Sequence, residues 1–342
     1  MKKTILISSF LIILSLPILI VINCGDDTGN EQPPTELCVW IADEYNNAVR
    51  RFSIDGSEEL GGLYETLDDP RSVSVDKHDS SAWIADRYNG RILKIKENGD
   101  VIFTSEFYQY TRVNWVVCDS SDGSCWGCVR DDGYVVKLDV NGNELGRATN
   151  MGFPFFCCLD ENGNCWVADE RVNKVYLILK DLNGNRNINE VALLTIDAPG
   201  VGIITPDGEG GIFVSLEDTN EIKHFNDAGE TTSTISGFEE ISAIWFNTTS
   251  RRLWAGDGDT LRLLDGDAIG NVDIADVEIA SINGFGSIDY IQISSYDDTT
   301  WVSDKGLDSV HIIDQNCMER LNKIEGFFDP FGISIRDEVV ER

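Results

Sequence analysis

The sequence predicts an all-β fold: a seven-bladed β-propeller of four-stranded antiparallel blades, whose first blade is completed by the C-terminal strand. Two observations predict the blades. A short apolar motif with a central aromatic residue recurs at intervals of 40 to 47 residues, and Asn-Gly or Asp-Gly pairs occupy matching positions between the motifs. The seven central aromatics are Trp40, Trp83, Trp126, Trp166, Phe213, Trp254 and Trp301.

The second repeat shows the unit most clearly. Four short stretches alternate apolar with polar residues or are apolar throughout, and a polar turn follows each of the first three. No helical period lies between them. The predicted strands are residues 71–76, 82–85, 91–96 and 101–107.

The two ends of the repeat array predict how the ring closes. The array opens at Cys38 on a strand of the second type, and it ends at residues 330–335 on a strand that matches residues 70–75. We therefore expect the C-terminal strand to complete the blade that the N-terminus begins, which gives seven blades and ties the ring shut.

The first 24 residues predict export. Lys2 and Lys3 precede an apolar run, and residues 21–24 resemble the lipobox of bacterial lipoproteins, with Cys24 as the lipidated residue. Asn23 departs from the small residue usual in that motif, and an uncleaved membrane anchor is the alternative. We expect residues 1–24 to be a lipoprotein-type signal segment, 25–36 a flexible polar stalk, and 37–342 the propeller, tethered in the cell envelope on its periplasmic or its outer side.

The charge balance limits the partners. The formal net charge is −32, from 59 acidic and 27 basic residues. A phosphate backbone would be repelled, so we expect no nucleic-acid partner. We expect a monomer whose acidic surface keeps it soluble.

Nine cysteines fit an oxidising compartment. Lipidation of one leaves an even number, and two pairs, each seven residues apart, flank predicted turns. Cys128 with Cys157 and Cys38 with Cys317 are further possible pairs, and free thiols or a metal at Cys125-x-x-Cys128 are the alternatives. The disulfide candidates are Cys118, Cys125, Cys158 and Cys165.

The run Ala85-Asp86-x-x-Asn89-x-x-Ile92, preceded by Pro70, resembles NHL-type β-propeller repeats. The resemblance covers nearly all of the chain after the stalk, although the third, fifth and sixth repeats depart from it. It implies the fold and leaves the function open, because NHL propellers include scaffolds, sensors and a few enzymes.

Two acidic patterns have structural interpretations. An Asp recurs at the end of most second strands, where its side chain can hold the following turn. The run Asp181-x-Asn183-x-Asn185-x-Asn187 lacks the Gly and the closing acid of a calcium loop, so a long hairpin turn is favoured.

The best binding hypothesis is the mouth of the central channel, where the first strands begin. Mixed aromatic and charged residues there suit recognition; the alternative is that the same aromatics only plug the axis. The candidate residues are Arg71, Arg112, Asn114, Trp115, Phe155, Asp289, Tyr290 and Phe331.

We therefore predict a non-catalytic binding or scaffold propeller for a protein or small ligand. The alternative, which rests on resemblance to lactonase and streptogramin-lyase propellers, is a metal-assisted hydrolase or lyase. We predict no cofactor; calcium at Asn114 and Asp289 is the alternative. The histidines His78, His224 and His311 form no cluster in the sequence, as such lyases would require.

The cysteine hypothesis has a direct test. Thiol titration of the unfolded, unreduced protein should find fewer than eight free thiols, and the number should rise to eight after reduction. Eight free thiols before reduction would rule out the disulfides.

Overall fold

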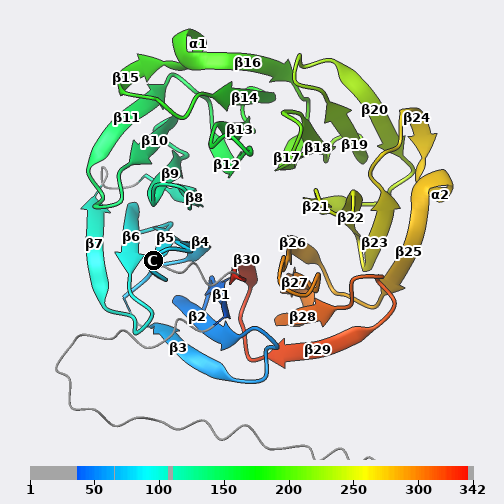
Figure 1. Cartoon of the computed structure of the whole chain (residues 1–342), viewed down its shortest axis with the longest axis horizontal. Helices are drawn as coiled ribbons and strands as arrows, with labels where there is room; N and C mark the ends of the chain where they lie inside the picture. Colours follow the sequence, from blue (N-terminus) through cyan, green and yellow to red (C-terminus); the bar gives the residue numbers. More distant parts are fainter. Residues whose placement is uncertain (1–36, 65, 107–110, 338–342) are drawn as a thin grey trace, which may run out of the picture. The chain divides into compact units, whose positions relative to one another are not determined.

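The computed structural model describes residues 37–64, 66–106 and 111–337. Seven sheets are arranged in a ring around an axis, and each runs from an inner first strand to an outer fourth strand (Figure 1). The predicted seven-bladed propeller is confirmed. The signal segment, the stalk and residues 338–342 lie outside the described residues.

Blade 1 is built from both ends of the described chain, as predicted. From the axis outward it holds β30 (Pro330–Arg336), β1 (Cys38–Asp43), β2 (Ala48–Ser53) and β3 (Glu59–Leu63). Antiparallel pairing joins β30 to β1, from Arg336 opposite Cys38 to Pro330 opposite Asp43. The N-terminal strand is thereby held between its own hairpin partner and the C-terminal strand.

The other six blades each follow the chain from the axis outward. Blade 2 holds β4 (Pro70–Val75), β5 (Ala82–Asp86), β6 (Arg91–Ile95) and β7 (Val101–Glu106). Blade 3 holds β8 (Val113–Asp119), β9 (Ser124–Val129), β10 (Tyr134–Leu138) and β11 (Glu144–Thr149). Blade 4 holds β12 (Pro154–Leu159), β13 (Cys165–Asp169), β14 (Lys174–Ile178) and β16 (Ala192–Asp197).

Blades 5 to 7 complete the ring. Blade 5 holds β17 (Val201–Pro206), β18 (Ile212–Leu216), β19 (Glu221–Phe225) and β20 (Thr231–Ser236). Blade 6 holds β21 (Ile241–Asn247), β22 (Arg252–Asp257), β23 (Thr260–Asp265) and β25 (Glu278–Asn283). Blade 7 holds β26 (Ile288–Ile293), β27 (Thr300–Asp304), β28 (Ser309–Ile313) and β29 (Arg320–Glu325), with the short 3₁₀ helix η1 (Lys305–Leu307) between β27 and β28.

Two insertions add a fifth strand to a neighbouring blade. The segment predicted as a long hairpin turn instead forms β15 (Gly184–Asn187) and the one-turn helix α1 (Ile188–Val191), and β15 pairs in parallel with β11 of blade 3. The insertion in blade 6 forms β24 (Gly270–Asp273) and the one-turn helix α2 (Ile274–Val277), and β24 pairs in parallel with β20 of blade 5. Each insertion covers an outer sheet edge that would otherwise be open, and it joins two blades at the rim.

The recurrent aromatics form the core between blades. Trp40, Trp83, Trp126, Trp166 and Trp301 are fully buried on the second strands. Directly opposite Trp83 lies Lys94, whose ammonium nitrogen stands 5.1 Å from the ring centroid and 3.3 Å from an oxygen of Asp76. Trp83 shares one core cluster with Val116 and Val136 of blade 3, so the motif serves packing between blades, as predicted. No helix among the described residues is long and apolar enough to cross a bilayer.

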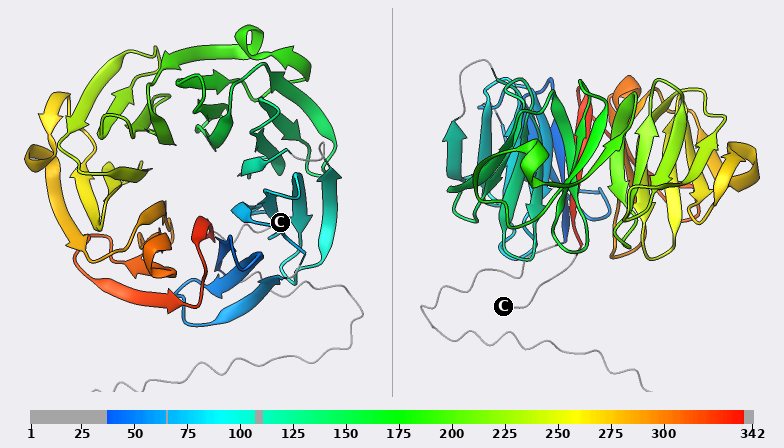
Figure 2. Two further views of the ribbon diagram at one scale, coloured as in Figure 1. Left: turned by 180° about the vertical axis from the view of Figure 1, so that it is seen from behind. Right: turned by 90° about the horizontal axis from the view of Figure 1, so that it is seen from above.

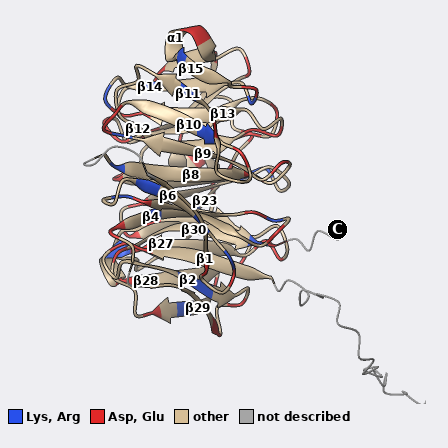
Figure 3. Ribbon diagram, turned by 90° about the vertical axis from the view of Figure 1, so that its left-hand side faces the viewer, with Lys and Arg blue, Asp and Glu red and all other residues tan. Residues whose placement is uncertain are grey.

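Charged side chains lie mostly in the loops at the two ends of the blades (Figure 3). We call the end at which the first strands begin the upper face and the opposite end the lower face. The side view shows the blades standing side by side with their loops at these two faces (Figure 2). The first residue of β1, Cys38, and the last residue of β30, Arg336, lie opposite each other on the lower face.

Closure by β30 has a direct test. A chain that stops after residue 329 loses the strand that pairs with β1 and that also contacts the first strands β4 and β26. Because the fully buried β1 would then form an open edge beside an exposed core, we expect loss of the cooperative thermal transition in calorimetry. A chain that stops after residue 337 is the control and should melt like the full chain; a cooperative, wild-type transition for the shorter chain would contradict the closure.

Candidate functional site: the upper mouth and the axial plug

Every first strand carries a β-bulge just after it begins. In blade 2, Pro70 pairs with Asp86 and Ser72 with Ala85, so Arg71 is the extra residue. A bulge re-aims the side chain of the extra residue, here at the upper mouth of the channel. The residues at the bulge positions, from blade 1 to blade 7, are Phe331, Arg71, Asn114, Phe155, Gly202, Ser242 and Asp289.

The bulges place most of the predicted mouth residues together. Arg71, Asn114, Phe155 and Asp289 all stand at this one position of their blades. Arg112 lies outside it, in the loop before β8, where its guanidinium binds the Asp131 carboxylate at 2.7 and 2.8 Å.

An aromatic plug closes the axis just below the bulges. In blades 3, 4 and 7 the residue after the bulge is aromatic, and the bulge residue Phe331 of blade 1 joins these three rings. The Trp115 ring centroid lies 4.4 Å from that of Phe156, 5.1 Å from Tyr290 and 6.0 Å from Phe331. All four side chains are buried. Four blades thus meet through aromatic contacts, and Trp115 and Tyr290, predicted as mouth residues, lie in this plug beneath the mouth.

A second ring of side chains follows the second strands. The first residue after each strand lies at the upper face, and most of these residues are charged. From blade 1 to blade 7 they are Glu44, Arg87, Arg130, Glu170, Glu217, Gly258 and Lys305. Sequence reasoning missed this ring, although the position is constant: it directly follows the recurrent Asp or its replacement.

Blades 7, 1 and 2 bring these charges into ion pairs. Arg71 lies 3.4 Å from Glu44, and its guanidinium stands 4.1 Å from the Phe331 ring centroid. Lys305 lies 2.9 Å from Asp329 and 3.9 Å from Asp289. The cations on this side of the mouth are therefore matched by carboxylates.

Burial has the largest effect on the pKa values of Glu44 and Asp289. It raises the pKa of Glu44 to about 7, against the opposing effect of Arg71. It raises the pKa of Asp289 to about 6, against the effect of Lys305. Two mouth carboxyls therefore titrate near neutrality instead of in their ordinary acidic range.

The other side of the mouth differs. Arg130 pairs with Glu170 at 2.9 Å, but Glu217 and Asp218 of blade 5 are exposed, and their carboxylates make no hydrogen bond or ion pair to other described residues. Partial burial, followed by the charges of Glu170 and Asp218, raises the pKa of Glu217. The neighbouring ring positions of blades 5 and 6 hold only small residues: Gly202, Ser242 and Gly258.

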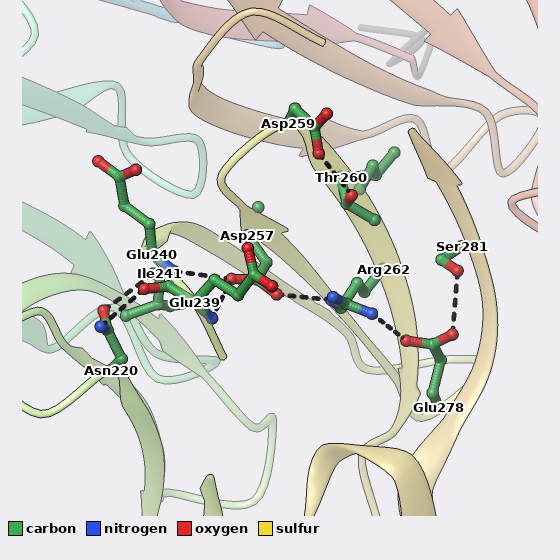
Figure 4. A network of polar contacts seen from close by, with 12 residues as sticks. Asn220, Glu239, Glu240, Ile241, Asp257, Asp259, Thr260, Arg262, Glu278 and Ser281 are labelled. Carbon is green, nitrogen blue, oxygen red and sulfur yellow. Dashed lines mark hydrogen bonds and ion pairs between the residues drawn. The ribbon is translucent and has the colours of Figure 1, made fainter. Parts of the chain in front are cut away.

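The recurrent Asp at the end of the second strand is structural, as predicted. In blade 6 the Asp257 carboxylate accepts the backbone N–H groups of Glu239 and Glu240 at 2.7 and 2.8 Å, and its other oxygen accepts from Arg262 at 2.8 Å (Figure 4). The corresponding bonds to the preceding loop recur at Asp43, Asp86, Asp169 and Asp304.

The histidines lie away from the mouth. His224 on β19 contacts Asp207 at 2.8 Å, and His311 on β28 contacts Asp304 at 3.2 Å. His78 lies in the lower turn after β4. Within residues 37–64, 66–106 and 111–337, no group of three or more His, Cys, Asp or Glu side chains is placed to hold a metal ion.

The eight cysteines of the described residues are buried, with free thiols. Cys118 lies directly opposite Cys125, so their pairing remains a prediction that the register allows. Cys165 lies opposite Leu159, which turns Cys158 to the other face of the sheet and leaves Cys157 as the thiol that contacts Cys165. Register therefore argues against a Cys158–Cys165 bridge. The predicted lipidation site, Cys24, lies outside the described residues.

Comparison with known proteins supports the fold alone. No protein-family model and no curated protein matches the chain. Among solved structures, a protein from Lactobacillus plantarum is similar with a TM-score of 0.68 and 12% identity, over 88% of this chain and 99% of that one. Virginiamycin B lyase from Staphylococcus aureus is similar with a TM-score of 0.62 and 13% identity, over 78% and 92%. A catalytically inactive histidine-to-alanine variant of that lyase with quinupristin gives 0.60 and 15%, over 73% and 83%.

The buried Glu44 predicts a pH dependence of stability. Its folded-state pKa of about 7 lies above the ordinary value of 4.5, so the unfolded chain ionises first as the pH rises, and the free energy of unfolding falls between these two values. Glu44→Gln removes this loss. We expect the variant to gain up to about 3 kcal/mol over the wild type between pH 4.5 and pH 7.5, measured by urea unfolding.

The control for this measurement is Glu161→Gln, which changes one exposed carboxylate in a lower turn. Its stability difference from the wild type should stay constant over the same range. If the stability difference between Glu44→Gln and the wild type also stayed constant with pH, burial would not raise the pKa of Glu44.

Proposed function

We propose that this protein is a non-catalytic binding propeller that takes a cationic partner, a basic peptide segment, at its upper mouth. The observation that carries the proposal is the distribution of charge. The cations Arg71, Arg87 and Lys305 each pair with a carboxylate, whereas Glu217 and Asp218 stand exposed without such a partner among the described residues. The exposed Arg171 of blade 4 also has no ion pair to other described residues, but Glu217, Asp218 and the exposed Asp259 of blade 6 outnumber it. The surplus charge at the mouth is therefore negative, which favours a positive ligand.

Exposed aromatic rings on the upper face support a peptide as the partner. Tyr45 and Phe328 are 54% and 52% exposed, and their rings meet edge to face with centroids 5.1 Å apart. Tyr88 of the next blade is 52% exposed. Exposed aromatic faces bind both apolar side chains and cations, so Lys or Arg flanked by apolar residues suits this surface.

The mouth supports binding by a preorganised surface. The bulges fix the direction of each mouth side chain, and the aromatic plug closes the axis directly beneath. A ligand would meet a shallow, rigid floor, which reduces the entropy lost on association. A stoichiometric metal in the purified protein would instead favour the alternative, a metal-assisted hydrolase or lyase.

The proposal includes a tether to the cell envelope. Export with a lipid on Cys24 would attach the chain to a membrane ahead of β1. Globomycin, which blocks lipoprotein signal cleavage, should cause the unprocessed chain to accumulate if this proposal is right.

Peptide selection tests the binding proposal. The full chain, purified in detergent, is panned against a random peptide library, and we expect the selected peptides to be rich in Lys or Arg. The double variant Glu217→Gln/Asp218→Asn should weaken their binding about 10-fold by calorimetry, because two charge contacts are lost.

The matched control is Glu161→Gln/Asp227→Asn, which removes the same charge from exposed lower-face turns. It should bind the peptides as the wild type does. Equal weakening by both double variants would mean that the peptides respond only to net charge, and the upper mouth would be excluded.

A further inference from the structure

Below the aromatic plug the channel is hollow and opens toward the lower face. A cavity of about 190 Å³ is bounded above by Trp115, Phe156 and Tyr290. It adjoins a second cavity of about 440 Å³, and the two share lining residues from blades 3, 4 and 6. The shared residues are Val117, Cys118, Cys158 and Trp245. The larger cavity falls in the range of small-molecule sites, about 300–1,000 Å³, and the smaller cavity extends it toward the plug.

The walls of this lower channel are largely apolar and aromatic. Trp245 packs edge to face on Tyr290 with ring centroids 6.2 Å apart, and Val73, Ile333 and Ile335 face the cavity from blades 1 and 2. Flat rings above and at the side favour a planar, apolar ligand, because stacked and edge contacts add to the burial of apolar area.

Hydroxyl groups on the first strands supply hydrogen-bond donors. Ser334 accepts the backbone N–H of Val75 at 3.0 Å, and Ser74 accepts that of Cys118 at 2.9 Å. A hydroxyl that accepts in this way keeps its own O–H to donate. Among the described residues, neither hydroxyl has an acceptor for that proton, and both line the cavity.

Gln292 adds an amide to the same cavity. Its carbonyl oxygen accepts from the Tyr290 hydroxyl at 3.4 Å, while its NH₂ group has no hydrogen-bond acceptor among the described residues. Three half-buried donors from blades 1, 2 and 7 thus border a space that apolar and aromatic side chains line together with Lys77, Ser120 and Asp337. A ligand that brings an acceptor satisfies such donors when it displaces water from them.

Charge at the opening is balanced. Lys77 lies 2.9 Å from Asp337, and the other oxygen of Asp337 accepts the backbone N–H and the hydroxyl of Ser295. An ionised ligand would therefore find no unpaired opposite charge there to offset the loss of its hydration.

We propose that the lower channel is a second binding site, for an uncharged, planar, largely apolar molecule that carries a carbonyl or a similar acceptor. The site is separate from the upper mouth, because the aromatic plug lies between them. It does not depend on the proposed peptide binding, and the Glu217→Gln/Asp218→Asn variant should leave it unchanged.

Photolabelling with benzophenone, an uncharged aromatic ketone, tests the site. The full chain in detergent is irradiated with benzophenone, and adducts are mapped by peptide mass spectrometry. We expect adducts on the first strands β8, β12 and β26. We expect 2-acetylnaphthalene, which carries a carbonyl, to compete about 3- to 10-fold better than 2-ethylnaphthalene, which has the same shape without it.

A cavity-filling variant localises the binding. Val117 occupies the position on blade 3 that Trp245 occupies on blade 6, since each pairs with the central Trp of its second strand. Val117→Trp should therefore fold and fill the cavity, reducing these adducts at least 10-fold. Val101→Trp, at a half-exposed position of the outer strand β7, is the matched control and should label like the wild type.

A polar variant tests the donors without changing the volume. Gln292→Leu should keep the benzophenone adducts and reduce the preference for 2-acetylnaphthalene over 2-ethylnaphthalene. This measurement decides the donor claim even if Val117→Trp fails to fold. Adducts spread over the outer strands, undiminished labelling of a folded Val117→Trp, or equal competition by the two naphthalenes in the wild type would overturn the proposal.

Discussion

The structure depends on one repeated interaction, the acceptance of loop N–H groups by a buried Asp at the end of the second strand. Asp304 accepts from Gly286 and Ser287 at 2.9 and 3.0 Å, and Asp169 accepts from Gly152 and Phe153 at 2.6 and 2.7 Å. The loops that donate are the ones that connect one blade to the next. Each Asp therefore fixes where the first strand of its own blade begins, and the starts of the first strands surround the upper mouth.

A bulge follows the start of each first strand, also in blades 3 and 5, where Val129 and Leu216 stand in place of the Asp. The loop enters the sheet at a fixed point, and one extra residue is then accommodated before regular pairing resumes. The bulge separates two functions along one short strand. The extra residue, such as Arg71 or Asp289, faces the mouth, and the next large residue, such as Trp115 or Tyr290, closes the axis. The plug divides the channel into a charged upper mouth and an apolar lower channel, and these two environments suit different ligands.

The sequence allowed the blade number, the closure by the last strand and the packing role of the tryptophans to be predicted, because each depends on a pattern that recurs at a fixed spacing. The bulges themselves were not predicted. The predicted mouth residues include Asn114 and Phe155, which stand at bulge positions, and also Trp115, which lies in the plug. Alternation along a strand cannot show that one extra residue shifts Trp115 onto the axis. The insertion after Asp181 was predicted as a turn, because its pairing partner β11 belongs to another blade.

The sequence by itself determined the architecture, since seven copies of one motif can bury their two faces only against one another. The tertiary structure decided which side chains and which cavity lie where the blades meet. It showed that Glu44 is buried among other carboxylates, that Cys157 and not Cys158 contacts Cys165, and that a cavity lies below Tyr290. These features arise where side chains from three or four blades converge on the axis. The distance between such residues along the chain carries no information about their distance in the ring.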